Sequence, residues 1–484
     1  MSFLRRFGPA LALLAFFLTV LTVGLATHPF EYDTDEGLNL IKAMLVGRGY
    51  SLYSQIWSDQ PPVFTYLLAW WFKLTGPSVT AGRVLVLGFS CLLLISLYNT
   101  VRIIEASRLR AFVAAAMAGL CAWYSYHSFA VMIGLPALGL GVCALWLAAQ
   151  SRLRGNVLLA ALAGILMALS LQTKLFTAVF VPSLIVLLLA PIPNLPQSPM
   201  RTRLALLVAM LFCCAAVFLG IWLLAHEPAR QIVSTHTTVS DLPDEPRPTK
   251  VYTVMRRDWA LSLLAVLSIA LIRRKNVWQH LLPLLWLVVA AIALQMHNPV
   301  WRHHSLLLTI PAAWAGALAL VWLWNATRFK WLRCAGIALA CYIVVFGIRN
   351  IARLTLFDIP PEAKQDIRAR EELLARVKQC QSHTQWLFSD LPMVAFRAGI
   401  PTPPSVAVVS VKRMNAGQLS DADILAAMET YDPEQIAIGR VPFSADVVKY
   451  FDEHYRLMWQ ERKVSHYLRA DLPGATTQPN PSGP

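Results

Sequence analysis

The sequence predicts a polytopic α-helical membrane protein. We expect about 11 transmembrane helices, amphipathic interfacial helices in the first outer loop, and a small C-terminal α/β extracytoplasmic domain. Of the 484 residues, 57% are hydrophobic and 14% are charged, whereas about 25% of the residues of a soluble domain are charged. Apolar runs recur along most of the chain, and basic residues concentrate in the short segments between them. So much apolar surface requires the bilayer as a solvent.

Eleven apolar runs are the candidate spans. Several are shorter than the roughly 20 residues that a spanning helix needs, so their boundaries are approximate. The runs lie near residues 9–27, 80–101, 109–125, 128–149, 157–172, 174–191, 204–225, 258–272, 277–296, 305–325 and 334–350. Between Asp59 and Glu227 the sequence contains one carboxylate, Glu105, and between Asp258 and Asp358 it contains none. A carboxylate at mid-bilayer costs roughly 3 kcal/mol or more, so the acid-rich segments should be aqueous.

The charges of the loops predict the orientation, because cytoplasmic loops are rich in Lys and Arg. One set of alternating loops carries Arg5, Arg6, Arg102, Arg108, Arg110, Arg152, Arg154, Arg201, Arg203, Arg273, Arg274, Lys275, Arg328, Lys330 and Arg333. We therefore expect a multi-pass protein of the inner or plasma membrane, with a cytoplasmic N-terminus. Residues 1–27 also have the pattern of a cleaved signal peptide, but in a polytopic chain we favour an uncleaved first helix.

The same pattern divides the chain into parts. Residues 1–357 form the predicted transmembrane domain, in which 28–79 is the first outer loop; residues 358–472 form the extracytoplasmic α/β domain and 473–484 a disordered tail. In the α/β domain the pattern predicts strands at 386–388, 406–411 and 436–438 and helices near 420–430 and 444–455. The net charge of +15 reflects the cytoplasmic loops. No nucleic-acid-binding pattern accompanies it, so we expect the bilayer and not nucleic acid as a partner.

The first outer loop carries the candidate chemistry. Glu31, Asp33, Asp35 and Glu36 lie within six residues and precede an amphipathic stretch that ends near Gly47. A polar turn with Pro61-Pro62 follows, and then a second stretch rich in aromatic residues. Two amphipathic segments that flank a polar turn suit helices in the interface plane. Such a loop would hold its acids at the membrane surface, where a lipid-linked head group also lies.

The Asp35-Glu36 pair after the first helix, the following helix and the Pro61-Pro62 motif resemble the first outer loop of GT-C membrane glycosyltransferases. The nearest branch is that of the protein O-mannosyltransferases and aminoarabinose transferases, similar to glycosyltransferase family 39. The resemblance implies a polyprenyl-phosphate sugar donor and inverting transfer to a hydroxyl of a protein, glycan or lipid. It implies that Asp35 is the catalytic base and that Glu36 orients substrate or helps hold a metal. A helix N-terminal charge is the simpler reading of Glu36.

One position departs from that family, whose members often have Lys before the proline pair. Gln60 stands there in this chain, beside Asp59, and we expect this pair to position substrate unless Asp59 is a simple turn residue. Other cations of the predicted outer face are candidates for the donor phosphate, because Arg and Lys bind phosphate. These are Lys174, Arg256, Arg257 and Arg302, with His303 and His304 beside the last. The plainer alternative is that the arginines extend to lipid head groups.

A divalent metal ion is the one cofactor that the sequence leaves open. Asp35 and Glu36 are its candidate ligands, although no metal-binding histidine spacing occurs. The competing functions are a lipid or glycan transporter or flippase, a polysaccharide polymerase or ligase, and a structural protein. Apart from Asp258, the first residue of the run 258–272, no candidate span contains a carboxylate, which argues against a proton-coupled carrier. The acidic first loop distinguishes a glycosyltransferase from a polymerase or ligase.

Overall fold

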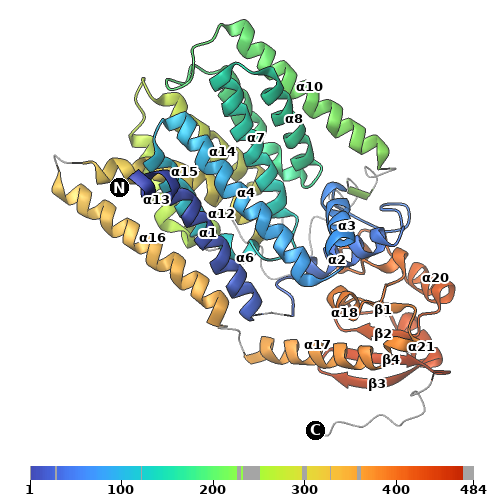
Figure 1. Ribbon diagram of the computed structural model, residues 1–484. Coiled ribbons are helices and arrows are strands. Elements are labelled where there is room, and N and C mark those ends of the chain that lie inside the picture. Colours follow the sequence, from blue (N-terminus) through green and yellow to red (C-terminus); the bar gives the residue numbers. More distant parts are fainter. Residues whose placement is uncertain are drawn as a thin grey trace.

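The computed structural model describes residues 2–27, 30–121, 123–225, 231–232, 251–296, 302–326, 329–356 and 361–472. Figure 1 shows a bundle of long helices with a small mixed domain at one end. The long and short helices of the bundle are α1 (Ser2–Thr27), α4 (Val79–Glu105), α5 (Arg108–Gly119), α6 (Tyr124–His127), α7 (Gly134–Arg154), α8 (Val157–Leu171), α9 (Val181–Leu189), α10 (Met200–Leu224), α12 (Val251–Arg257), α13 (Trp259–Ala270), α14 (Val277–Gln295), α15 (Leu306–Trp324) and α16 (Lys330–Leu356). The 3₁₀ segments η1 (Leu175–Phe180) and η2 (Arg302–Ser305) precede α9 and α15.

Each of the eleven predicted apolar runs contains a described helix. Six helices are long and apolar enough to cross a membrane, namely α4, α7, α10, α14, α15 with the end of η2, and α16, and four further apolar helices are shorter. Helix α15 is apolar all round and nearly every side chain on it is buried, as expected for a helix at the centre of a bundle. The helical membrane-protein class is thus supported, and the number of 11 spans stays a prediction.

Four of the basic loops meet at one end of the bundle. The backbone carbonyl of Ile104, near the end of α4, accepts hydrogen bonds from Asn194 (2.9 Å) and from Gln279 on α14 (3.0 Å). Arg152 at the end of α7 donates to the carbonyls of Leu188 and Ala190. Four of the loops that the charge pattern assigns to one side therefore lie together.

The first outer loop contains the two predicted helices, α2 (Thr34–Gly47) and α3 (Val63–Thr75). Figure 1 shows them between the helix bundle and the mixed domain. The apolar face of α2 is buried in the main core of the bundle, with Leu40, Ile41 and Leu45 completely covered. This placement is what the amphipathic spacing of α2 dictates.

The mixed domain follows α16. Its elements are α17 (Pro361–Gln379), η3 (Gln381–His383), β1 (Leu387–Ser389), α18 (Pro392–Ala398), η4 (Pro404–Val406), α19 (Val411–Asn415), α20 (Asp421–Tyr431), β2 (Gln435–Ile438), α21 (Ala445–His454), β3 (Tyr455–Glu461) and β4 (Val464–Arg469). The sheet has the order β1-β2-β4-β3, with β1 parallel to β2 and the other neighbours antiparallel. The predicted α/β class, two of the three predicted strands and both predicted helices are confirmed.

The third predicted strand, at 406–411, is wrong. Its residues belong to η4, an irregular segment and the start of α19, although Val406, Val408 and Val409 are buried. The stretch is apolar because it fills the core of the domain. Prolines at 401, 403 and 404 precede it, and proline cannot donate to a strand ladder. The predicted tail, 473–484, lies outside the described residues.

The mixed domain holds the first outer loop tightly. Gly37 on α2 faces the backbone of α18: a Cβ there would lie 2.7 Å from the backbone nitrogen of Met393. Only glycine permits so close an approach without a shift of one helix. Further contacts join Glu31 to Arg370, Arg397 to the carbonyl of Phe30, Arg48 to the carbonyl of Gly399, Phe72 to Phe396 and Trp57 to Gln418.

Candidate active site

The first turn of α2 places the acids of the outer loop. Asp33 is the N-cap residue, and its side chain accepts a hydrogen bond from the backbone N–H of Asp35 (3.1 Å). Such a cap satisfies a backbone donor that the helix leaves free. Asp35 and Glu36 follow in the first turn, where the helix dipole favours negative charge. The local sequence therefore places both carboxylates in the first turn of α2, but their surroundings differ.

Glu36 is completely buried and both of its oxygens are fully used. Its Oε1 accepts hydrogen bonds from Arg83 Nε (2.8 Å) and from the backbone N–H of Val131 (3.1 Å). Its Oε2 accepts from the second guanidinium nitrogen of Arg83 (2.8 Å) and from the backbone N–H of Tyr32 (3.0 Å). A carboxylate offers about four acceptor positions, so Glu36 has no capacity left for a substrate or metal. It joins α2 to α4 and to the segment before α7.

Asp35 has the opposite surroundings. Its side chain is exposed, and within the described residues its carboxylate makes no hydrogen bond or ion pair. An ionised carboxylate that is accessible and unpaired can accept a proton from a bound hydroxyl. Of the two neighbouring acids, Asp35 is thus the one whose oxygens are available for chemistry.

Two buried lysines face the same region as Asp35. Lys42 on α2 is 4% exposed and Lys174, between α8 and η1, is 8% exposed. The Nζ of Lys42 lies 3.5 Å from Ser58 Oγ, the long limit for a hydrogen bond. The Nζ of Lys174 lies 5.9 Å from the centre of the Phe176 ring and makes no hydrogen bond or ion pair with any described residue. Each ammonium has three N–H donors, and most of these remain available for an anion.

Electrostatic interactions connect the two lysines with Asp35 and Asp59. Burial lowers the pKa of Lys42 and lowers the pKa of Lys174 to about 8, and the charges of Asp59 and Asp35 counter the shift at both lysines. Because Coulomb interactions weaken with distance and solvent, this shared influence places the two acids and the two lysines in one electrostatic site. The structure thereby brings together Asp35, Asp59 and Lys174, which the sequence predicted, and Lys42, which it did not.

Asp59 and Gln60 lie in the polar turn between α2 and α3. Asp59 Oδ2 is 3.3 Å from the Nζ of Lys412 on α19 of the mixed domain. Gln60 is held through its backbone carbonyl, which accepts hydrogen bonds from the hydroxyls of Tyr53 (2.8 Å) and Ser58 (3.2 Å). The predicted substrate-positioning pair therefore sits beside the lysines, with Asp59 paired across to the mixed domain.

The polar turn also contacts the turn that carries Lys174. The backbone N–H of Val63 donates to the carbonyl of Gln172 (3.0 Å). Gln231 also contacts this loop: its side chain accepts a hydrogen bond from the backbone N–H of Ser58 (3.0 Å) and donates one to the carbonyl of Tyr53 (2.6 Å). The positions of Asp59 and Lys174 are therefore coupled through backbone contacts.

A row of aromatic rings extends from Lys174 along the same end of the bundle. The ring of Phe176 lies 4.7 Å from that of His304, which is buried. His303 lies 4.4 Å from His304 and 6.4 Å from His127 on α6. The structure therefore brings His303 and His304 to the lysine site and adds His127. The side chain of Arg302 lies outside the described residues.

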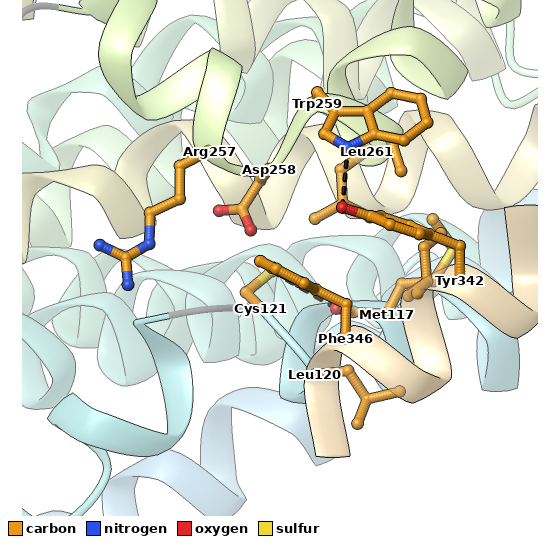
Figure 2. A pocket seen from close by; sticks show the side chains of 11 residues that line it. Met117, Leu120, Cys121, Arg257, Asp258, Trp259, Leu261, Tyr342 and Phe346 are labelled. Atoms are coloured by element: carbon orange, nitrogen blue, oxygen red, sulfur yellow. Dashed lines mark hydrogen bonds between the residues drawn. The ribbon is translucent and has the colours of Figure 1, made fainter. Parts of the chain in front are cut away.

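Arg257 reaches this row from the end of α12. Its guanidinium lies 4.1 Å from the ring centre of Trp123, which in turn lies 5.9 Å from the ring of His127. Figure 2 shows Arg257 at the edge of a small cavity, pointing away from the hydrogen-bonded pair Trp259 and Tyr342. Arg256, the neighbouring residue, is exposed and forms no hydrogen bond or ion pair with the histidines or lysines in the described part of the chain.

Sequence reasoning missed Lys42, Lys412 and His127. A signal existed for Lys42, because a lysine interrupts the apolar face of an otherwise amphipathic helix, and a buried lysine needs a compensating charge or ligand. Lys412 lies about 350 residues from Asp59 in the chain, and only the tertiary fold brings it to the loop. His127 lies between the predicted runs 109–125 and 128–149, and nothing in the local sequence marks it as a site residue.

The residues present do not fit a divalent metal ion at Asp35 and Glu36. The oxygens of Glu36 are filled by four donors, and the nearby ammonium groups would repel a cation. Among the described residues no group of three or more His, Cys, Asp or Glu side chains is placed to hold a metal.

Comparisons with known proteins place the fold. No protein family model matches the sequence, and no curated protein matches it significantly. ArnT from Cupriavidus metallidurans bound to undecaprenyl phosphate is similar in structure, with a TM-score of 0.65, 12% identity, and coverage of 95% of this chain and 98% of that one. The archaeal oligosaccharyltransferase AglB from Archaeoglobus fulgidus, in complex with an inhibitory peptide and a dolichol-phosphate, gives a TM-score of 0.59, 12% identity and coverage of 90% and 70%.

A second structure of the Archaeoglobus fulgidus oligosaccharyltransferase, in complex with Zn and sulfate, gives a TM-score of 0.51 at 11% identity and covers 95% of this chain and 74% of that one. ArnT and AglB are both members of the GT-C superfamily. At such low identity the likeness concerns the fold. The chain therefore has the GT-C fold, as the first outer loop and the helix pattern predict.

Proposed function

We propose that this protein is a membrane glycosyltransferase that moves a sugar from a polyprenyl-phosphate donor to an acceptor hydroxyl on the extracytoplasmic face, with inversion. The observation that carries the proposal is the site itself: an accessible, unpaired carboxylate, Asp35, beside two buried lysines, Lys42 and Lys174, most of whose donors are unfilled. The similar structures of ArnT and AglB were solved with undecaprenyl phosphate and dolichol-phosphate, and these lipids carry the anion that such lysines would bind.

The proposed reaction is a single displacement at the anomeric carbon. Asp35 takes the proton of the acceptor hydroxyl while its oxygen forms a bond to that carbon, from the face opposite the phosphate. The bond between the carbon and the phosphate oxygen breaks, and its electron pair stays on the polyprenyl phosphate. Lys42 and Lys174 stabilise that developing charge, as fixed cations do in other transferases. The products are the glycosylated acceptor with inverted configuration and free polyprenyl phosphate, and Asp35 then releases its proton.

The remaining predicted residues take supporting roles in this proposal. His304, which lies next to Phe176, and its neighbour His303 extend the donor site from the lysines. Arg257 approaches from α12 and suits the phosphate or its neighbouring lipid. Glu36 positions the helix that carries Asp35, because its four hydrogen bonds fix the first turn of α2. Roles for Arg256 and Arg302 stay predictions.

The test compares wild type with Asp35→Asn after reconstitution with a panel of radiolabelled polyprenyl-phosphate sugars. Donor loss, including hydrolysis to free sugar, is the readout, with a crude membrane extract as the source of acceptor. Removing a general base lowers a rate by about 10²–10⁴-fold, so we expect turnover to fall about a hundredfold or more while the donor still binds. Asp33→Asn is the matched control, because Asn also caps helices well and the substitution removes a neighbouring carboxylate.

Three results would contradict the proposal. If wild type neither binds nor consumes any donor of the panel, the protein does not use this class of substrate. If Asp35→Asn retains full turnover, another group is the base. If wild type binds donor but moves it across the vesicle membrane without cleaving it, the protein is a flippase, the transport alternative that the helix pattern leaves open.

A further inference from the structure

The mixed domain places a cation inside the candidate active site. Lys412 lies on α19, and its Nζ is 3.3 Å from Asp59 Oδ2. Both side chains are mostly covered, with the lysine 29% and the aspartate 20% exposed. Asp59 follows Ser58, whose hydroxyl is the hydrogen-bond partner of Lys42. The ion pair therefore lies directly against the lysine site, at the junction of the two domains.

Neighbouring contacts fix the position of Lys412 from both sides. The adjacent Arg413 donates to the carbonyls of Ser405 (3.0 Å) and Val408 (2.9 Å) inside the mixed domain. Its guanidinium also lies 5.1 Å from the ring centre of Trp57 in the first outer loop. The indole N–H of Trp57 donates to Gln418 (2.9 Å), just after α19. Helix α19 is thus anchored both to its own domain and to the loop that carries Asp59.

The charges of the site show what this ion pair accomplishes. The site contains the carboxylates of Asp35 and Asp59 and the ammonium groups of Lys42 and Lys174. Without Lys412 these four charges sum to zero, and the Asp59 carboxylate, whose charge acts on both lysines, would be left beside them. With Asp59 paired to Lys412, one positive charge remains uncompensated, and a sugar–phosphate–lipid diester carries one negative charge.

We propose that Lys412 is a positioning residue of the mixed domain that holds Asp59 away from Lys42 and Lys174 and so keeps both lysines free for the donor phosphate. This inference rests on the proposed function and gives the mixed domain a definite part in it. Lys412 acts through Asp59 and not on the phosphate itself. The inference therefore makes a prediction that direct phosphate binding by Lys412 does not: removal of the Asp59 charge should make Lys412 dispensable.

The experiment is a double-mutant cycle on the full-length protein, with undecaprenyl phosphate in detergent micelles as the binding probe. The variants are Lys412→Ala, Asp59→Asn and the two combined. We expect Lys412→Ala to raise the Kd about tenfold, since it leaves the Asp59 carboxylate beside the two lysines without the ion pair to Lys412. Asp59→Asn should bind as well as wild type or better, and the double variant should bind like Asp59→Asn. Lys449→Ala is the matched control, because Lys449 is exposed and forms only a surface pair in the same domain.

The kinetic readout separates this role from a general loss of structure. Lys412→Ala should raise KM for the donor with little change in kcat, because the interaction supports donor binding and not the proton transfer at Asp35. A misfolded variant would lose kcat as well, and the Asp59→Asn change would not restore it. Recovery in the double variant therefore also shows that Lys412→Ala folds.

Two results would overturn the inference while the proposed function survives: Lys412→Ala binds the probe like wild type, or the double variant binds as weakly as Lys412→Ala. The second result would make Lys412 a direct phosphate ligand. In both cases wild type binds the probe, and Asp35→Asn still binds it without turning over a donor sugar. If wild type itself does not bind undecaprenyl phosphate, the donor class is wrong and the inference fails with it.

Discussion

Replacing Glu36 by Gln tests whether this acid has a structural role. The change keeps the shape of the side chain but removes its charge and turns one acceptor oxygen into an N–H₂ donor. Each carboxylate oxygen now accepts one hydrogen bond from Arg83 and one from a backbone N–H. Whichever way the amide is oriented, its nitrogen therefore faces two donors. The variant loses two hydrogen bonds and leaves the buried guanidinium of Arg83 without its counter-ion.

The expected cost follows from these losses. Breaking a buried ion pair by removing one partner typically destabilises a protein by about 3–5 kcal/mol, because an uncompensated charge stays buried. Asp35→Asn, one residue earlier, should cost less than about 0.5 kcal/mol, as is usual for exposed positions. The two substitutions should therefore have different effects: Glu36→Gln lowers stability, and Asp35→Asn lowers turnover.

The assay is thermal unfolding of purified protein in detergent, followed by the loss of monodisperse protein on size-exclusion chromatography. Combining Glu36→Gln with Arg83→Met provides the control, since it removes the stranded charge and should recover part of the lost stability. An unchanged melting temperature for Glu36→Gln would refute the reasoning. So would a Glu36→Gln protein that is fully stable but inactive, since Glu36 would then act in the chemistry.

Two further predictions concern the surroundings of Asp35. Because burial lowers the pKa of Lys174 to about 8, the ammonium loses its proton as the pH rises through that value, and the Kd for polyprenyl phosphate should rise about tenfold between about pH 7 and pH 9. Lys174→Arg, which stays charged, should flatten this dependence; an equal slope in both proteins would exclude Lys174 as a phosphate ligand. Gly37→Ala should destabilise the protein by about 1–3 kcal/mol, because its Cβ would lie 2.7 Å from the backbone of Met393. Gly47→Ala, with nothing within 4 Å, should be neutral or stabilising in the same melting assay.

The sequence predicts the helices well because their cause is local. Hydrophobic runs mark the helices of the bundle, and the amphipathic spacing of α2 marks which face is buried. The capped first turn of α2 is also local, since Asp33 bonds to the backbone two residues on. The α2–α3 loop and its acids were therefore predictable to within a few residues.

The strands of the mixed domain were harder to predict for a physical reason. The hairpin of β3 and β4 turns at Arg462, which adopts a positive φ of 55°. Such turns usually contain Asn or Gly. Arg462 and Lys463 stand at this turn instead, so the sequence does not indicate a hairpin there. The segment before α19, in contrast, has the composition of a strand but is apolar because it is buried. Composition alone does not distinguish burial in a core from pairing in a sheet.

The surroundings of the candidate site residues depend on tertiary structure and could not be predicted from the sequence. Asp35 and Glu36 are adjacent acids in one helical turn, and nothing local distinguishes them. Their roles separate only when the fold brings Arg83 and Val131 to Glu36 and leaves Asp35 exposed. The cations are likewise brought together only by the fold: Lys42 comes from α2 and Lys174 from the turn before η1, while Lys412 of the mixed domain pairs with Asp59. Charged residues from distant segments can form one electrostatic site without leaving a local sequence motif. Experiments on this chain should therefore vary these charges in combination and not one position at a time.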